Sequence, residues 1–270
     1  MTGATGFLGS AIVSRLIETP RWDEVLLLVR ARNSTEGVAR VIETLKRFEV
    51  PEALLARVQP SQIVCGDFLL VDAFANDPRL GDVTEVVNCS AVTSFGRHPQ
   101  IRKVNVEGTG AFAEALMAKA KLRRFIHVGT AMSCGLNAVN PVIESDAFPE
   151  NAEHAVSYTE SKLESERRLR RIPGLPLVVV RPSIIVGHSR LGCKPSSSIY
   201  WVFRMGFALE RFLCDFDTQI DVVPVDYCAD IILRMLDATT LRETLYHISA
   251  GPEHSSTFRE IDRTIAAALG

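Results

Sequence analysis

The sequence has almost no net charge, no long hydrophobic run and no paired cysteines, and each absence excludes a class of protein. The 30 Lys and Arg residues against 32 Asp and Glu residues leave a formal charge of −2. This is too little for a broad field that attracts nucleic acid or anionic lipid, so any bound anion must be held by local geometry. With 47% hydrophobic residues, the 270-residue chain is long enough to bury the core of one large α/β domain.

The longest apolar runs, such as 25–29 and 177–180, have the length of strands and cannot cross a bilayer. The first residues have neither the basic nor the apolar region of a secretory leader, so we expect a cytoplasmic protein. The six cysteines contain no Cys-x-x-Cys pair, and the six histidines share no spacing typical of metal ligands. Free thiols and no metal site are therefore expected.

Short β-branched runs alternate with longer amphipathic segments. This alternation predicts an α/β fold with a doubly wound parallel sheet of the Rossmann type. The irregular segment 187–198, rich in Gly, Ser and Pro, and the part that follows it predict a small C-terminal substrate lobe. We expect an NADP-binding domain over 1–185 that also receives 220–237, interleaved with a substrate-binding lobe over 186–270. The predicted strands are 24–29, 61–65, 84–89, 125–129 and 177–182, and the predicted helices are 8–18, 35–48, 105–120, 155–171 and 199–211.

A glycine-rich turn opens the chain and leads into the first predicted helix. Its glycines permit a tight turn, close approach of a pyrophosphate and close helix packing, which predicts a dinucleotide site. The turn is formed by Gly3, Thr5, Gly6, Phe7, Leu8 and Gly9. Such a turn normally follows a strand in the middle of the sheet, and here it begins at Thr2. We therefore expect that the first strand is missing and that the sequence is a fragment or starts upstream of Met1.

Arginines follow the next predicted strand. Arg30 stands about twenty residues after the glycines, where an NAD site would carry Asp or Glu. The charge and the bidentate fork of Arg suit a 2′-phosphate, so this position predicts NADP(H). Arg40, in the following helix, could close on the same phosphate or on the adenine face.

Two more strand ends are candidate cofactor contacts. Asp67 and Phe68 could offer a carboxylate and an amide to the adenine amino group. Small residues at Ser90, Ala91 and Val92 would let the backbone pass close to the cofactor. Each position could equally be a plain exit from strand to loop.

Tyr158 and Lys162 stand four residues apart and so share one face of a predicted helix. A nearby ammonium group is expected to lower the phenol pKa from about 10 towards working pH, so that Tyr158 can exchange a proton. Thr130, at the carboxyl end of a predicted strand, could bind the same substrate oxygen. His127, inside that strand, is expected to be a core residue rather than a base.

Over essentially its whole length, the chain resembles the extended short-chain dehydrogenase/reductase family. The motifs that carry the resemblance are the glycine turn, Val-Asn-Val-Glu-Gly-Thr at 104–109, Tyr158-x-x-x-Lys162, Val-Arg-Pro-Ser at 180–183 and Val-Pro-Val-Asp-Tyr at 223–227. Thr-Gly-Ala-Thr-Gly-Phe-Leu-Gly, Leu-Val-Arg-Ala and the strand end Gly-Thr-Ala look most like the thioester reductase and fatty acyl-CoA reductase branch.

This resemblance implies an NADPH-dependent reduction of an acyl thioester, as acyl-CoA or carrier-bound, to an aldehyde or alcohol. Tyr158 would protonate the oxyanion as hydride arrives, Lys162 would bind the nicotinamide ribose, and Thr130 would hold the carbonyl oxygen. Asn105 would brace the site. The residues implied to lie against the nicotinamide are Pro182, Ser183 and Ile184.

Two residues depart from the pattern of that branch, which bears on the substrate more than on the cofactor. Gly129 stands before the catalytic Thr, where Ser is usual, and Thr159 follows the catalytic Tyr, where Gly is common. A nucleotide-sugar epimerase or a hydroxysteroid-type dehydrogenase of the same family remains open. A dehydratase is disfavoured, because Ala131 and Met132 stand where its acid and base would be.

A non-catalytic NADP(H)-binding regulatory protein is the alternative from another class, but it would be expected to lose Tyr158 or Lys162, and both are present. The basic segments 167–171 and 119–124 could receive an acidic acyl-carrier protein or upstream domains. A solvated helix face is the simpler interpretation.

Overall fold

The computed structural model describes residues 1–96, 98–139, 141–145, 147, 150–191, 197–211 and 214–269. The predicted free thiol of Cys193 and part of the segment 187–198 lie outside these residues. The five cysteines within them, at positions 65, 89, 134, 214 and 228, carry free thiols, as their spacing predicted.

A parallel sheet forms the centre of the molecule, and it consists of two parts. One part has the order β2-β1 and the other has the order β3-β4-β5-β9, with every neighbouring pair parallel. Thr2 lies between the two parts and forms single-residue bridges to Leu28 and Asn88. The strands are β1 (Leu27–Val29), β2 (Ile63–Cys65), β3 (Glu85–Asn88), β4 (Arg124–Val128), β5 (Leu177–Pro182) and β9 (Leu245–Ile248).

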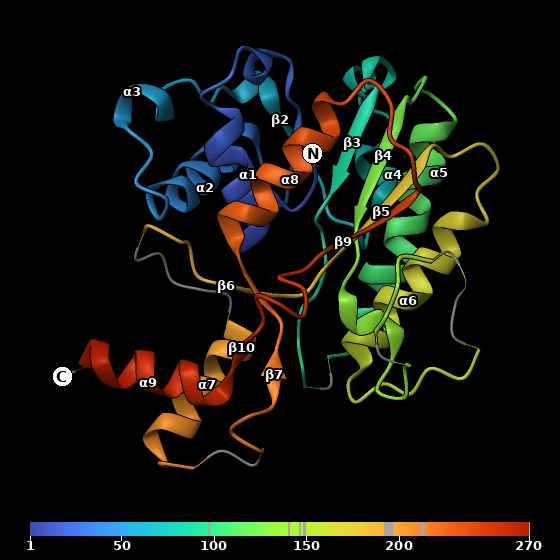
Figure 1. Ribbon diagram of the computed structural model, residues 1–270. Helices are drawn as coiled ribbons and strands as arrows, with labels where there is room; N and C mark the ends of the chain where they lie inside the picture. The colour runs from blue at the N-terminus through green and yellow to red at the C-terminus, as the bar shows by residue number, and fades with distance from the viewer. Residues whose placement is uncertain are drawn as a thin grey trace.

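Helices cover both faces of the sheet, and each face has its own hydrophobic core (Figure 1). Helices α1, α2 and α8 share one core with Val87 and Ile126, whereas α4, α5 and α6 share the other with Val86 and Phe125. Adjacent strand residues therefore point to opposite faces, as expected for a doubly wound sheet. The helices are α1 (Phe7–Leu16), α2 (Ser34–Lys46), α4 (Val71–Ala75), α5 (Thr109–Met117), α6 (Ser157–Arg170) and α8 (Val225–Asp237).

Short helices and turns complete the sheet domain. The π-helical turn η4 (Lys103–Gly108) runs directly into α5, so the predicted helix 105–120 has two kinds of helical turn. The other short elements are η1 (Pro20–Glu24), α3 (Glu52–Leu55), η2 (Pro60–Gln62), η3 (Pro78–Asp82) and η5 (Ala131–Cys134).

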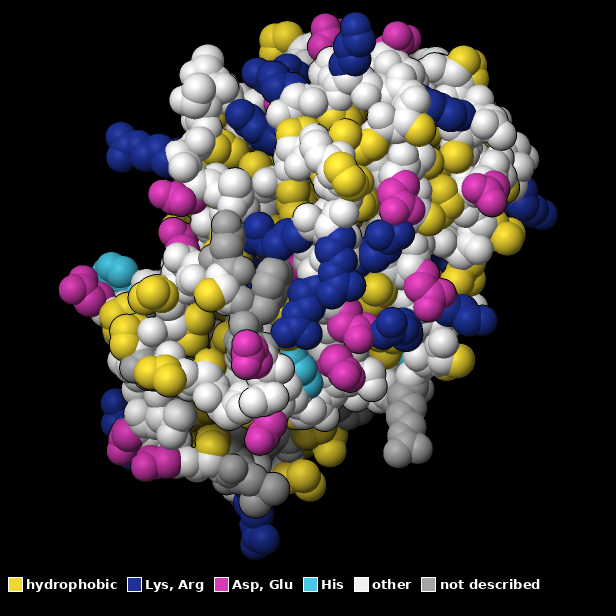
Figure 2. Space-filling model, turned by 90° about the vertical axis from the view of Figure 1, so that its right-hand side faces the viewer, with side chains coloured by type: hydrophobic (Ala, Val, Ile, Leu, Met, Phe, Trp, Pro, Cys, Tyr) yellow, Lys and Arg dark blue, Asp and Glu magenta, His cyan; other side chains and the backbone are white. Residues whose placement is uncertain are grey.

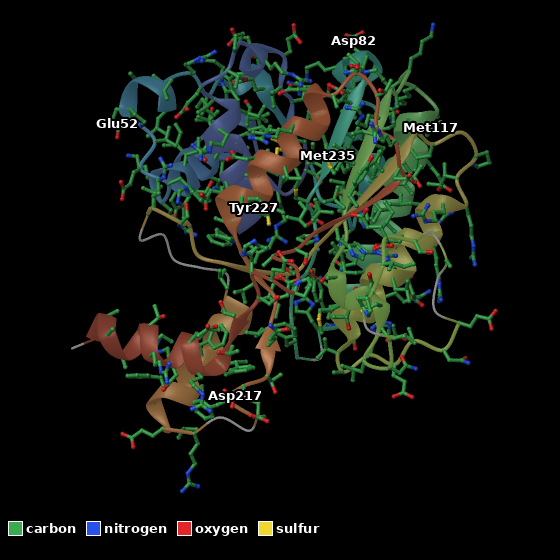
Figure 3. All side chains as sticks on the ribbon, viewed as in Figure 1. Glu52, Asp82, Met117, Asp217, Tyr227 and Met235 are labelled. Atoms are coloured by element: carbon green, nitrogen blue, oxygen red, sulfur yellow. The ribbon has the colours of Figure 1, made fainter. Side chains whose placement is uncertain are left out.

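A smaller group of elements lies apart from the sheet, below it in Figure 1. Strand β7 (Gln219–Ile220) pairs antiparallel with β10 (Ser256–Thr257), and Phe203 of α7 (Ser197–Ala208) contacts Phe258 of α9 (Phe258–Leu269) at 6.1 Å between ring centroids. Asp217, labelled in Figure 3, pairs with Arg259 at 2.8 Å. Strands β6 (Ile184–Val186) and β8 (Val222–Pro224) pair in parallel between this group and the sheet.

The predicted doubly wound parallel sheet is confirmed, and each of the five predicted strands overlaps a strand of it. The predicted helices overlap α1, α2, α5, α6 and α7. The division of the chain at 185/186 and the absence of a first strand stay predictions.

Candidate active site

A cavity of about 570 Å³ brings together side chains from the carboxyl ends of the strands and from α1 and α6. It joins the glycine turn to the predicted catalytic residues, which are far apart in the sequence. The predicted site residues that line it are Gly6, Phe7, Leu8, Gly9, Ala91, Thr130, Tyr158, Lys162, Pro182, Ser183 and Ile184.

The glycine turn approaches β3 so closely that side chains are excluded. Gly3 has a φ of +68°, and a Cβ there would lie 2.7 Å from the carbonyl carbon of Cys89. A Cβ at Gly9 would overlap the carbonyl oxygen of Gly3. Helix α1 begins after Gly6 with no side-chain cap and no acidic residue in its first turn. Its free amides and dipole fit the diphosphate of a dinucleotide.

The residues predicted for the 2′-phosphate gather beyond the ends of β1 and β2, outside the cavity. Arg40 Nη1 donates to the carbonyl oxygen of Arg30, which places the Arg40 guanidinium group against the backbone of that residue. Arg30 is 71% exposed, and its Nη1 lies 3.8 Å from Oδ2 of Asp67. The Arg30 guanidinium group, mostly exposed and beside one carboxylate, is therefore free to turn towards a phosphate.

Other predicted cofactor residues lie near the cavity without lining it. Ser90 donates its amide to Thr2 Oγ1 at 3.3 Å, and Val92 is fixed through its backbone. The side chain of Phe68 is buried in the core, 5.1 Å from the ring of Phe112, so only its backbone could meet an adenine. Thr5 and Gly3 belong to the turn but not to the cavity wall.

Tyr158 and Thr130 face the same cavity from different elements. The Thr130 hydroxyl oxygen accepts from the amide of Met132 at 3.3 Å, which leaves its hydrogen available to a substrate oxygen. The ring of Phe95 meets that of Tyr158 edge-on, with 6.4 Å between centroids. Burial raises the pKa of the Tyr158 phenol to about 12. The expected lowering of this pKa by the ammonium group is therefore wrong, because loss of hydration disfavours the charged phenolate.

Lys162 is 3% exposed and lies one helical turn beyond Tyr158. Burial lowers the pKa of its ammonium group to about 8, while Glu166 and Cys89 act in the opposite direction. At neutral pH Lys162 is mostly charged and lines the cavity as a cation.

Asn105 braces the site, as the resemblance implied. Its Oδ1 accepts from the amide of Val92 at 2.7 Å, and its Nδ2 donates to the Val92 carbonyl at 3.1 Å and to Ser161 Oγ at 2.9 Å. One buried side chain thus ties the loop after β3 to helix α6.

A buried polar chain passes behind the site. Thr2 Oγ1 donates to Asn88 Oδ1 at 2.6 Å. The other end of the Asn88 side chain is its amide nitrogen, so Asn88 Nδ2 donates to His127 Nδ1, which lies 3.1 Å away. His127 must then carry its proton on Nε2, which donates to Ser165 Oγ at 3.1 Å. Burial lowers the pKa of His127 well below its usual value. The prediction that His127 is a core residue rather than a base is confirmed.

Sequence reasoning missed several residues of the cavity wall. His154 Nδ1 lies 3.1 Å from Thr159 Oγ1, and that hydroxyl donates to the Val156 carbonyl at 3.0 Å. Thr159 therefore accepts from His154 and holds its imidazole at the cavity. The one sign of this contact in the sequence was that Thr stands at position 159, where Gly is common in the thioester reductase branch. Phe95 and Leu136 also line the cavity, although no pattern singled them out, and so do Met132 and Val202.

The basic segments are less available to a partner than their sequence indicates. Figure 2 shows Lys and Arg side chains in a band with Asp and Glu among them. Within these segments, Arg168 Nη2 lies 2.6 Å from Glu114, and Arg123 Nη2 lies 2.7 Å from Glu85. Arg124 belongs to no surface patch: it is 5% exposed, and it donates to carbonyl groups at the end of α8.

Within the described part of the chain, no three His, Cys, Asp or Glu residues gather to hold a metal ion. None of the helices described is both long and apolar enough to span a membrane.

Known proteins share this sequence pattern and fold. Residues 1–232 match the NAD-binding family described as male sterility protein. A linear gramicidin synthase from Brevibacillus parabrevis is 28% identical over 245 residues, which cover 87% of this chain and 5% of that protein. Aldehyde reductase lnaA of Aspergillus flavus is 26% identical over 268 residues, covering 92% of this chain and 25% of that protein.

Among solved structures, the terminal R domain from the myxalamid PKS-NRPS biosynthetic pathway has a TM-score of 0.84 at 23% identity, covering 98% of this chain and 68% of that one. This likeness shows the fold. The chain spans only 5% and 25% of the two curated relatives named above.

Proposed function

This chain belongs to the male sterility protein family, in the thioester reductase-like branch of the extended short-chain dehydrogenases/reductases, and on that premise we propose that it reduces an acyl thioester with NADPH. The product is an aldehyde or, after a second reduction, an alcohol. The proposal assigns the cofactor to the cavity beside the glycine turn.

The residues of the turn and of the strand ends would hold the cofactor. The free amides at the start of α1 suit its diphosphate, and Arg30 with Arg40 suits a 2′-phosphate. Pro182, Ser183 and Ile184 would form the wall against the nicotinamide. When bound, the cofactor supplies the hydride.

Tyr158, Thr130 and Lys162 would act on the substrate oxygen. Thr130 donates its free hydroxyl hydrogen to the carbonyl oxygen and fixes its position. Tyr158, which holds its proton with a pKa of about 12, donates that proton as negative charge develops on the oxygen. Lys162 stabilises this charge from one turn away and binds the ribose hydroxyl groups. Cleavage of the carbon–sulfur bond, as the hydroxyl proton leaves the oxygen and the sulfur gains a proton, then releases the thiol and the aldehyde.

The observation that carries the proposal is that one cavity joins an anion-binding turn to this catalytic set. Its wall also favours an acyl group over a sugar. Phe95, Met132, Leu136 and Val202 line it although each is among the exposed large hydrophobic residues of the chain. Exposed apolar side chains at a cavity suit an apolar ligand, whereas sugar hydroxyl groups need polar partners.

Delivery of the thioester by CoA or by a carrier domain is part of the proposal. One relative is a gramicidin synthase, and the solved relative is a terminal R domain of a PKS-NRPS pathway. Carrier-bound substrates fit this context. The ion pairs of Arg168 and Arg123 argue against a purely electrostatic docking face.

The test is oxidation of NADPH, followed by absorbance, against acyl-CoAs, carrier-bound thioesters, nucleotide sugars and hydroxysteroids. We expect turnover with thioesters, a loss of at least about 100-fold in Tyr158→Phe, and nearly unchanged NADPH binding in that variant. Tyr227→Phe is the matched control, since Tyr227 is 46% exposed on α8 and outside the cavity. Turnover of sugars or steroids alone would contradict the proposal, and cofactor binding without any turnover would favour a regulatory protein.

A further inference from the structure

Glu166 is a fully buried carboxylate to which the proposed reaction gives no task. Its Oε2 accepts from Arg181 Nη2 at 2.7 Å and from Arg181 Nε at 3.1 Å, so the two side chains form a forked ion pair. Glu166 is 0% exposed and Arg181 is 4% exposed. Because a buried pair is weak evidence for stability, its position in the molecule needs another explanation.

The pair stands directly behind the catalytic residues. Glu166 follows Lys162 by one turn of α6, and Arg181 lies near the end of β5. A Cβ at Gly129 would lie only 2.5 Å from Glu166 Oε1 and 3.3 Å from Arg181 Cγ. The carboxylate is therefore packed against the backbone that leads into Thr130. The missing side chain at position 129 makes room for it.

Several titratable groups face Lys162 from the elements around it. Cys89, at the end of β3, has its thiol pKa raised to about 12 by burial, so it is neutral at neutral pH. His127 of β4 is neutral as well, and Tyr158 keeps its proton. Glu166, whose carboxylate is paired with Arg181, is the larger influence that favours the charged form of Lys162.

We propose that Glu166 is a positioning residue whose carboxylate, held by Arg181 against Gly129, keeps Lys162 charged in the buried wall of the cavity. This inference rests on the proposed function, because Lys162 needs its charge to bind the ribose and to assist Tyr158. Without the carboxylate, the buried amine would release its proton near working pH.

The direct test is a titration of Lys162 by NMR of protein labelled at the lysine Cε carbons. The chain has six lysines, and Lys162→Arg assigns the signal. In the wild type we expect a pKa of about 8. In Glu166→Gln we expect it to fall by about one unit or more. Glu164→Gln is the matched control: it removes a carboxylate of the same helix that pairs with exposed Arg102, and it should leave the titration unchanged.

A second variant keeps the test valid if Glu166→Gln does not fold. Glu166→Gln alone leaves the buried Arg181 charge without a partner, so the double variant Glu166→Gln/Arg181→Gln removes both charges. The Lys162 pKa is expected to fall less in the double variant, because loss of the Arg181 cation opposes loss of the carboxylate. An unchanged Lys162 pKa in whichever of these variants folds would overturn the proposal.

The titration needs no substrate, which separates this proposal from the function. A protein inert towards every thioester but with a shifted Lys162 would overturn only the function. An active reductase whose Lys162 does not shift would overturn only the positioning role. In an active enzyme, the alkaline limb of the kcat/KM profile should move to lower pH in the same variants.

Discussion

At the scale of single residues, the two neighbours on α6 are tuned in different ways. Burial raises the pKa of Tyr158 to about 12 and lowers that of Lys162 to about 8. Both changes favour the neutral form, as desolvation requires. The phenol therefore keeps the proton that it donates in the proposed reaction, whereas the ammonium group loses its proton as the pH rises past about 8.

This range predicts an alkaline limit to catalysis. Lys162 is an ammonium group below pH 8 and an amine above it, so kcat/KM should fall as the pH rises past about 8. Steady-state kinetics from pH 6 to 10 will show this limb. Lys162→Arg keeps its charge throughout that range, so any activity that it retains should lack the limb. A limb that persists in Lys162→Arg would have to be assigned to another group.

Arg30 should decide between the two nicotinamide cofactors. Since it is 71% exposed and has only a 3.8 Å ion pair, its guanidinium group can turn to a 2′-phosphate. Arg30→Ala should weaken NADPH binding roughly tenfold and NADH binding hardly at all. Fluorescence titration measures both. Arg32→Ala, which removes an 88% exposed arginine paired with Glu36, is the control. Equal losses for the two cofactors would contradict the assignment.

At the scale of elements, helix α8 depends on a strand that comes a hundred residues earlier. Arg124, at the start of β4, donates to the carbonyl groups of Met235, Leu236 and Ala238, where the helix ends. Met235 is labelled on α8 in Figure 3. A buried guanidinium group thus satisfies carbonyl groups that have no partner within the helix.

Arg124→Ala should lower the free energy of unfolding by about 3 kcal/mol, because it leaves these carbonyl groups without a donor. Urea denaturation measures the loss. Arg123→Ala is the adjacent control: Arg123 is 55% exposed and pairs with Glu85, so its loss should cost less than about 1 kcal/mol. Similar losses in both variants would show that the contacts with α8 contribute little.

Elements with strong local patterns could be predicted, and those held by distant contacts could not. The buried β-branched runs predicted five strands, including β5 over its full range. Strand β9 was missed because Leu-Tyr-His-Ile has no such run and relies on pairing with β5. The antiparallel pair β7–β10 joins two-residue strands that no period can identify.

Residues of the candidate site could likewise be predicted where they belong to a motif, but not where only contacts in the fold connect them. The spacing of Tyr158 and Lys162 and the three glycines predicted residues that share one cavity. Glu166 carries no motif of its own, and its connection to the site lies in the space over Gly129 and in its influence on Lys162. The direction of the Tyr158 pKa was mispredicted, because burial of the phenol cannot be read from its distance along the helix to Lys162.

At the scale of the whole molecule, the buried, neutral imidazole of His127 makes the free energy of unfolding depend on pH. The pKa of His127 lies well below the value of about 6.5 that it has in an unfolded chain, because burial disfavours its charged form. Below pH 6.5 the unfolded chain therefore binds a proton that the folded chain does not. The folded state should lose up to about 1.4 kcal/mol per pH unit from this residue.

Denaturation at pH 7.5 and pH 5.5 will measure this slope. His127→Gln should make it shallower, since a Gln side chain can still accept from Asn88 and donate to Ser165 without titrating. His154 and His247, whose pKa values are also lowered by burial, should account for the slope that remains. An unchanged slope in His127→Gln would exclude His127 as the source.

The buried polar chain from Thr2 through Asn88 and His127 to Ser165 also selects against misfolded alternatives. Asn88 pairs with His127 in the register of β3 and β4, and each side chain finds its partner only there. A slip of one residue would bury these polar groups among valines with no hydrogen bond. An apolar strand pair alone would tolerate such a slip more easily. These four hydrogen-bonded side chains thus favour one alignment of β3 and β4, between the glycine turn and helix α6.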